Sequence, residues 1–168
     1  LQVSLVANRN LERSLTFTNP DGTVDYESYE GEWGFSEWRA QTGVVLAWDK
    51  WRFNWQARYL GAVGQDADAV DAFSDAFTAS DTCLGPPNDE LCRDYAEADS
   101  YMIHSISLFY KEDNWSLGMG VRNLEDKAPP LADPSELTGV QSRAIGYGYD
   151  LMGRSFFVNA SYNFDIGF

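Results

Sequence analysis

Hydrophobic and polar side chains alternate along much of this chain with a period of two, the repeat of a β-strand whose two faces differ. The second predicted strand shows it most clearly, with one face made of Trp38, Ala40, Thr42, Val44, Leu46 and Trp48. Arg9 and Arg13 interrupt the apolar face of the first strand, while Phe109 and Phe157 are apolar exceptions on the polar faces of later ones. The pattern predicts six strands, near residues 1–17, 38–48, 51–59, 102–110, 115–122 and 155–164.

The connections between these strands alternate in length. Residues 49–50 and 111–114 are short links, typical of hairpins between antiparallel neighbours, whereas residues 19–37, 64–99 and 123–153 are long. Outer-membrane barrels combine tight periplasmic turns with longer extracellular loops. We therefore expect an all-β fold of antiparallel transmembrane β-barrel strands, with extracellular long loops and a periplasmic C-terminus.

Within the second long connection, Phe73 and Phe77 lie four residues apart in a segment with helical spacing. This spacing favours a short helix, with an irregular loop as the alternative, because isolated short helices are marginally stable.

A soluble β-sandwich binding module would show the same alternation, so the position of the aromatic residues decides between the two. All three strand ends that the topology places on the periplasmic side carry aromatic residues on the apolar face. These residues are Trp48, Trp51, Tyr110, Trp115, Tyr162 and Phe164. Such a ring is expected where side chains anchor at a membrane interface, and a sandwich has no reason to form it.

The chain carries 26 Asp and Glu against 12 Lys and Arg, a formal net charge of -14, which excludes binding to a nucleic-acid backbone. The acids gather in the connections 19–37 and 64–99. We interpret these as acidic loops that face water, bridge through divalent ions to lipopolysaccharide, or bind calcium or a cationic substrate. No apolar run approaches the roughly 18 residues of a spanning helix, and the mean hydropathy of -0.38 does not argue against a barrel.

Few residues carry reactive chemistry. Cys83 and Cys92 flank a Pro- and Gly-containing segment and are predicted to form a disulfide in an oxidising compartment, with two free thiols as the alternative. His104 is the only histidine, so we expect no metal site. It is interpreted as a residue near the outer rim, with a ligand or a pH switch as the alternative. We expect no cofactor and no enzyme, because no catalytic set or phosphate-binding loop is present.

Two segments resemble a known family. Residues 120–130 read GVRNLEDKAPP and residues 149–158 read YDLMGRSFFV. They are similar to the N-L-F-D-K-x-P-P and Y-D-x-x-G-R-x-F-x-V segments near the end of TonB-dependent receptors, and residues 36–39 are a weaker match to the P-x-W-R element of that family. The main matching positions are Asn123, Leu124, Asp126, Pro129, Pro130, Tyr149, Asp150, Gly153 and Arg154. Glu125 departs from the family by replacing an aromatic residue.

The resemblance implies that residues 1–168 are the C-terminal part of a 22-stranded barrel, whose plug domain, TonB box and earlier strands are absent here. Leu1 is preceded by no Met, which we interpret as a mature or internal piece. The whole receptor would take up a siderophore, cobalamin, carbohydrate or similar nutrient across the bacterial outer membrane, energised by the TonB complex. Its surroundings would be membrane lipid and lipopolysaccharide.

The family also implies a C-terminal assembly signal, here Tyr162 with Phe164 or Phe168 as the terminal aromatic residue. A passive porin or an autotransporter-type barrel is the alternative, which would share the alternation but lack the two segments.

Four arginines fall on the polar faces of the predicted strands and are candidates to line the barrel lumen. They would either guide an anionic substrate or pair with carboxylates of the plug, and the second reading is favoured. These residues are Arg39, Arg52, Arg58 and Arg122.

Overall fold

The computed structural model describes residues 1–64, 97–131, 139–140, 143–144 and 146–164. Cys83, Cys92, Phe168 and the segment with helical spacing around Phe73 and Phe77 lie outside these residues. No helix long and apolar enough to cross a membrane occurs in the described part of the chain.

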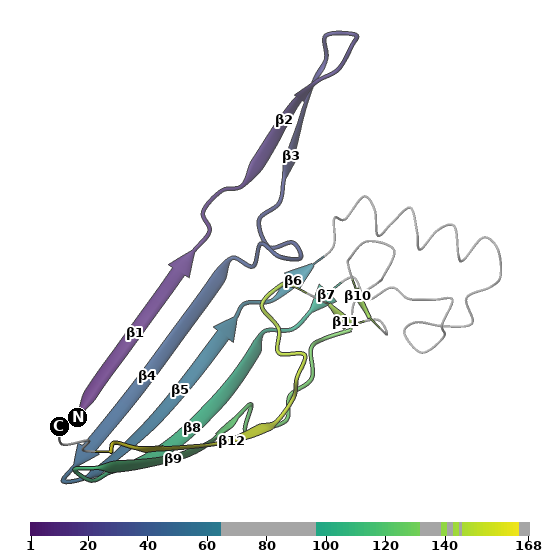
Figure 1. Ribbon diagram of the computed structural model, residues 1–168. Helices are drawn as coiled ribbons and strands as arrows, with labels where there is room; N and C mark the ends of the chain where they lie inside the picture. The colour runs from purple at the N-terminus through teal and green to yellow at the C-terminus, as the bar shows by residue number, and fades with distance from the viewer. Residues whose placement is uncertain (65–96, 132–138, 141–142, 145, 165–168) are drawn as a thin grey trace.

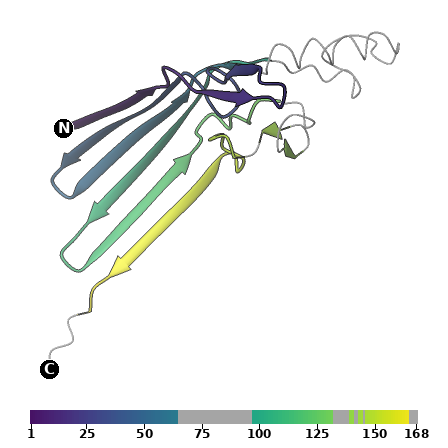
Figure 2. The same cartoon turned by 90° about the horizontal axis from the view of Figure 1, so that it is seen from above.

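Six strands form one antiparallel sheet, as the alternation predicts. Among these six, each strand lies beside the one that precedes it and the one that follows it along the chain. The sheet curves, and its first and last strands lie at opposite edges (Figures 1 and 2). In sheet order the strands are β1 (Gln2–Arg9), β4 (Trp38–Trp48), β5 (Trp51–Leu60), β8 (Tyr101–Lys111), β9 (Trp115–Arg122) and β12 (Ser155–Tyr162).

Strand register gives the sheet two chemically distinct faces. One row of paired residues runs across all six strands as Val3, Val44, Trp55, Ile106, Val121 and Phe156. The neighbouring row, on the opposite face, contains Gln2, Val45, Asn54, Ser107, Gly120 and Phe157. We call these the apolar face and the polar face. The apolar face is largely uncovered, since Met119 of β9 is 49% exposed and Phe156 of β12 is 75% exposed.

The two apolar exceptions on the polar face each cover a glycine of the adjacent strand. Phe109 is paired with Gly118, and Phe157 is paired with Gly120. A Cβ added to either glycine would lie 2.4 or 2.6 Å from the phenyl ring, far inside van der Waals contact. The rings therefore occupy space that exists because these positions lack a side chain, an arrangement known to stabilise glycine within sheets.

The first strand is shorter than predicted. β1 ends at Arg9, and the residues that continue the alternation form a separate hairpin of β2 (Ser14–Thr18) and β3 (Val24–Ser28), which projects beyond the sheet (Figure 1). The prediction of one strand to residue 17 and a loop from residue 19 is wrong, because a period of two is the same in one long strand and in two successive ones. The interruption by Arg9 and Arg13 marks the boundary.

Short strand pairs and a small core lie at the end of the sheet that carries the long connections. β6 (Val63–Gly64) pairs with β7 (Glu97–Ala98), and β10 (Gly139–Val140) pairs with β11 (Arg143–Ala144). Buried apolar residues here include Trp33, Leu60, Val63, Ala98, Tyr101, Ile103 and Ala144. Three of these, Leu60, Tyr101 and Ile103, belong to the polar face, so this face is apolar and covered at its loop end.

Candidate functional site

The six-stranded sheet contains no Asp or Glu, although the whole chain has 26 of them. Its charged residues are cations, and all but one of them lie on the polar face. On that face register places Arg39, Arg52, Arg58, Lys111 and Arg122. The polar face of the sheet is therefore electropositive within a strongly acidic protein.

The aromatic residues at the short-turn end form a continuous row on the apolar face. Trp48 pairs with Trp51, whose ring centroid lies 4.7 Å from that of Tyr110. Tyr110 in turn lies 5.3 Å from Trp115, which pairs with Tyr162. The row thus crosses five of the six strands at one level of the sheet, as the alternation predicts.

An ion pair joins the two short turns beside this row. Lys50 Nζ lies 2.5 Å from Glu112 Oε2, and the Tyr110 hydroxyl also donates to the Glu112 carboxylate. The hydrogen bonds from Lys50 and Tyr110 lower the pKa of Glu112, and the bond to Glu112 raises the pKa of Lys50. Both charges are therefore favoured at neutral pH.

The four predicted arginines share the polar face but have different surroundings. The Arg39 guanidinium donates to the Gly34 carbonyl, and Arg52 lies in a hollow at the short-turn end beside Asp49, Glu112 and Asp113. Arg58 and Arg122 line another hollow, nearer the long connections. No described carboxylate forms a salt bridge with any of these four side chains.

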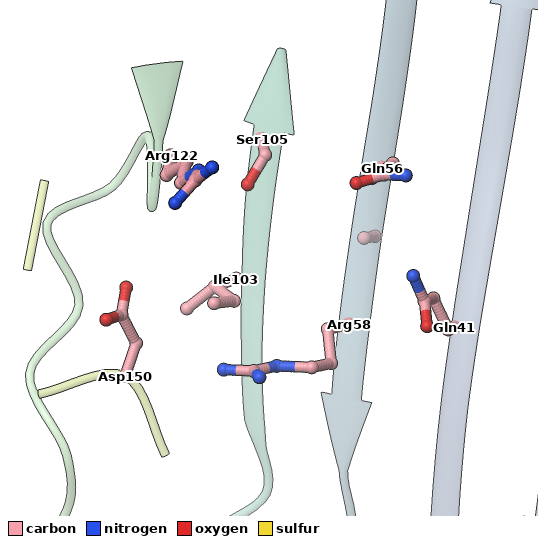
Figure 3. A pocket seen from close by; sticks show the side chains of 8 residues that line it. Gln41, Gln56, Arg58, Ile103, Ser105, Arg122 and Asp150 are labelled. Atoms are coloured by element: carbon pink, nitrogen blue, oxygen red, sulfur yellow. The ribbon is translucent and has the colours of Figure 1, made fainter. Parts of the chain in front are cut away.

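The hollow at Arg58 and Arg122 has a volume of about 280 Å³. Figure 3 shows its walls, which come from four strands of the sheet and from the segment before β12. The two arginines, Gln41, Gln56 and Ser105 all fall on the polar faces that the alternation predicts, and Asp150 belongs to a family-like segment. The alternation contains no signal that brings these residues together in one hollow. The polar side chains that line the hollow are Gln41, Gln56, Arg58, Ser105, Arg122 and Asp150.

Asn123, in the family-like segment 120–130, holds the turn that follows β9. Its side chain is fully buried and its backbone has a φ of 50°, a left-handed conformation that asparagine tolerates. The side-chain amide donates to the Lys127 carbonyl at 2.9 Å, and its Oδ1 accepts from the Lys127 N–H at 2.8 Å. Asn123 therefore closes a compact loop that an aliphatic side chain would leave without partners.

The two family-like segments touch each other through Asp126. Its Oδ1 accepts the backbone N–H of Arg154 at 2.7 Å. Gly153 has a φ of 68°, and a Cβ at this position would lie 2.9 Å from the same oxygen. An aspartate in one segment and a Gly-Arg pair in the other thus form one contact, which we call the Asp126–Gly153 contact.

Tyr149 of the second segment packs over the loop end of the polar face. Its ring lies 5.1 Å from Tyr101 and 6.1 Å from Trp33, measured between centroids. The Tyr101 hydroxyl donates to the Lys127 carbonyl at 3.0 Å, which links this cluster to the Asn123 loop. Burial raises the pKa of the Tyr149 phenol, and the nearby Arg39 charge partly opposes that shift. Packing of Tyr149 thereby places the adjacent Asp150 at the hollow.

Glu125, which departs from the family pattern, contacts His104 on the apolar face. Its Oε2 accepts the His104 backbone N–H at 3.2 Å, and its Oε1 lies 3.9 Å from the imidazole Nε2. The imidazole stacks on Trp55 with ring centroids 5.5 Å apart. Sequence analysis placed His104 near the rim but found no role for Glu125, because the two residues are 21 positions apart.

The other predicted site residues have simpler surroundings. The Leu124 N–H donates to the His104 carbonyl at 2.8 Å, Pro129 is buried and Pro130 is partly buried. β12 ends at Tyr162, and Phe164 follows the strand with its ring centroid 4.7 Å from that of Tyr162. No group of three or more metal-binding side chains occurs among the described residues.

Comparisons with known proteins returned little. No protein-family model and no curated protein matches this chain. One solved structure is similar, a mutant of the ferric enterobactin receptor of Pseudomonas aeruginosa, with 18% sequence identity and a TM-score of 0.48. The match covers 91% of this chain and 22% of that one, so this chain spans about a fifth of the length of that receptor. The fold described here rests on strand order and register instead.

Proposed function

We propose that residues 1–168 form the last six strands of an outer-membrane barrel of the TonB-dependent receptor type. The whole protein would take up a scarce nutrient with energy passed from the inner membrane through the TonB complex. The observation that carries the membrane assignment is the continuous, exposed apolar face of the sheet with its row of aromatic residues at one end.

Water is a poor environment for such a face. Exposed apolar patches beyond a few hundred Å² mark a surface that contacts a partner or a membrane. The opposite face carries arginines, amides and hydroxyls, which lipid would exclude and a wet or plugged lumen would accept. A sheet that is apolar towards lipid and polar towards the interior therefore accounts for both faces, whereas a soluble sandwich requires a second sheet over the apolar face.

Completion of the barrel requires further strands. β1 and β12 each pair along one edge only within the described sheet, and an unpaired backbone group in lipid costs several kcal/mol. Known membrane barrels have at least about eight strands, so six do not close. We propose that β1 and β12 each pair with strands of the same receptor that lie outside this chain, and that the barrel has 22 strands, as in the family.

The Asp126–Gly153 contact favours a receptor over a porin or an autotransporter. The two family-like segments are separated by about twenty residues in the sequence, yet Asp126 bonds directly to the backbone of Arg154. Two segments that resembled the family by chance would have no reason to contact each other. Here Asp126 of one segment accepts the hydrogen bond that the Arg154 backbone N–H of the other donates.

The proposed orientation places the short turns and Phe164 in the periplasm and the long connections outside the cell. The aromatic row would then lie at the periplasmic interface, and Tyr162 with Phe164 or Phe168 would act in assembly. The outer lipid surface would contact the apolar face, and lipopolysaccharide would surround its loop end.

Two measurements test this proposal. Residues 1–168 expressed with an outer-membrane signal peptide should give no heat-modifiable, protease-resistant monomer, whereas the complete protein should give one. A folded monomer of residues 1–168 would contradict the proposed closure by further strands.

The second measurement separates a receptor from a passive pore. The purified complete protein should bind the periplasmic domain of TonB and remain closed in planar bilayers, because a plug occludes the barrel. Stable open-channel conductance without TonB binding would instead establish the porin alternative.

A further inference from the structure

The hollow at Arg58 and Arg122 has the chemistry of an anion site. Its walls supply two guanidinium groups, the side-chain amides of Gln41 and Gln56 and the hydroxyl of Ser105. Guanidinium groups bind carboxylates and phosphates through paired charge-assisted hydrogen bonds, which are about twice as strong as neutral ones. Neutral amide and hydroxyl donors beside them add orientation without adding a competing charge.

Among the described residues, no acidic side chain forms a salt bridge with these arginines. The sheet contributes no carboxylate, and Asp150 is the one acid among the described residues that line the hollow. Asp150 Oδ1 accepts the backbone N–H of Met152 at 3.0 Å, and no described salt bridge joins it to either arginine. The described residues of the hollow therefore supply two positive charges and one negative charge, a net charge of about +1.

The other arginines of the polar face are placed differently. Arg39 donates to the Gly34 carbonyl, and Arg52 lies at the short-turn end, in a hollow where three acidic residues balance Arg52 and two lysines. Arg58 and Arg122 share a hollow in which, among the described residues, cations outnumber acids and neutral donors lie beside them. The Arg122 guanidinium also lies 5.6 Å from the Phe157 ring centroid, which restricts its orientation towards the hollow.

We propose that this hollow binds an oxyanion, a carboxylate or phosphate group of a small ligand that arrives from the loop end. Its volume of about 280 Å³ accepts one such group and a few attached atoms, at the lower limit of small-molecule sites. Figure 3 shows Arg58 extending towards the side of the hollow where Asp150 lies, while Ser105 and Arg122 lie at the other end, past Ile103. The direction of arrival rests on the proposed function, but the binding of the oxyanion does not.

The test uses the purified complete protein in detergent, with citrate and inorganic phosphate as probes and sodium chloride at equal ionic strength as the control. Phenylglyoxal modifies accessible arginines, and peptide mass spectrometry measures its rate at each position. Citrate or phosphate should slow modification of Arg58 and Arg122 several-fold and leave Arg52 unchanged. Equal protection of all three arginines, or protection of none, would overturn the proposal.

Three variants refine the result. Arg58→Gln should weaken binding of the protecting probe by at least about tenfold, the loss expected for a charge-assisted hydrogen bond. Arg52→Gln, on the same face but in the other hollow, should bind it normally. Asp150→Asn keeps an oxygen for the Met152 N–H and removes the competing charge, so binding should tighten by on the order of threefold. A weaker site in Asp150→Asn would contradict an oxyanion ligand.

The barrel interior offers another source of the same chemistry, a side-chain carboxylate of the polypeptide itself. In that case Arg58 and Arg122 would resist phenylglyoxal even without a probe, and citrate would change nothing, which refutes a free ligand. Because these readouts need neither TonB nor uptake, failure of this site is distinguishable from failure of the proposed transport function.

Discussion

Placing a charge on each face of the same strand tests the membrane assignment most directly. Val44 and Val45 are neighbours in β4, carry the same side chain and point to opposite faces of the sheet. Val44 belongs to the apolar face and Val45 to the polar face. The substitutions Val44→Arg and Val45→Arg therefore differ in the medium that receives the guanidinium and in little else.

The depth of Val44 follows from its distance along the strand. It lies four residues from Trp48, which with a rise of about 3.3 Å per residue and a tilt of about 40° is about 10 Å from the aromatic row. The lipid-facing band of an outer-membrane barrel is about 25 Å tall, so Val44 lies near its centre. An arginine at the midplane costs about 2 to 4 kcal/mol, which is a factor of about 30 to 900 in the folding equilibrium.

The assay is urea unfolding of the complete protein in phosphatidylcholine vesicles, followed by the shift of the folded band in unheated gels. Val44→Arg should lower the urea midpoint well below that of Val45→Arg, which should stay close to the parent protein. Equal urea midpoints for the two variants would refute the interpretation that one face of the sheet contacts lipid and the other a polar interior. A lower urea midpoint for Val45→Arg than for Val44→Arg would indicate that the polar face, and not the apolar face, is the one that is closely packed.

Three further predictions concern the connections. Gly153→Ala should lower the free energy of unfolding by about 1 to 2 kcal/mol because of the left-handed backbone. The close approach of the added Cβ to Asp126 should lower it further. Gly146→Ala, with a φ of 85° and nothing within 4 Å of its Cβ, is the matched control, so equal loop proteolysis of the two variants would contradict a role for the contact. The pKa of Glu112 is lowered in the folded state, so its ion pair stabilises the turns above the unfolded pKa and is lost as the pH falls through the folded value. Glu112→Gln should therefore remove the decrease of the urea midpoint at acid pH that this ion pair causes. A variant with the same pH profile as the parent protein would show that the ion pair does not stabilise the fold. Cys83 and Cys92 should appear as one linked species in non-reducing peptide maps, whereas two alkylatable thiols would exclude the disulfide.

The strands and their faces were predictable because each depends on local alternation alone. Trp51, Phe53 and Trp55 share a face whatever lies beside them, since successive side chains of a strand point in opposite directions. The tight link at residues 49–50 then makes β4 and β5 neighbours, and Asp49 adopts the left-handed φ of 50° that such a turn requires. The end of β1 was not predictable in this way, because β2 continues the same period after a change of direction.

The candidate site depends on contacts that alternation does not encode. Asp150 reaches the hollow because Tyr149 packs against Tyr101 and Trp33, which come from distant parts of the chain. Phe109 and Phe157 depart from the polar alternation, and the reason is that register places each ring over a glycine of the adjacent strand. In both cases the deciding partner lies on another strand or loop, and a single sequence contains no signal for that pairing.

The separation of charge between the sheet and its connections links the two proposals. In the proposed barrel, a carboxylate on the apolar face would have to enter lipid, and one on the polar face would neutralise the arginines beside it. Excluding acids from all six strands meets both conditions, and the acidic residues of the chain fall in the connections and after β12 instead. In the proposed anion site, the guanidinium groups of Arg58 and Arg122 can then hold an oxyanion because no carboxylate of the sheet competes for them.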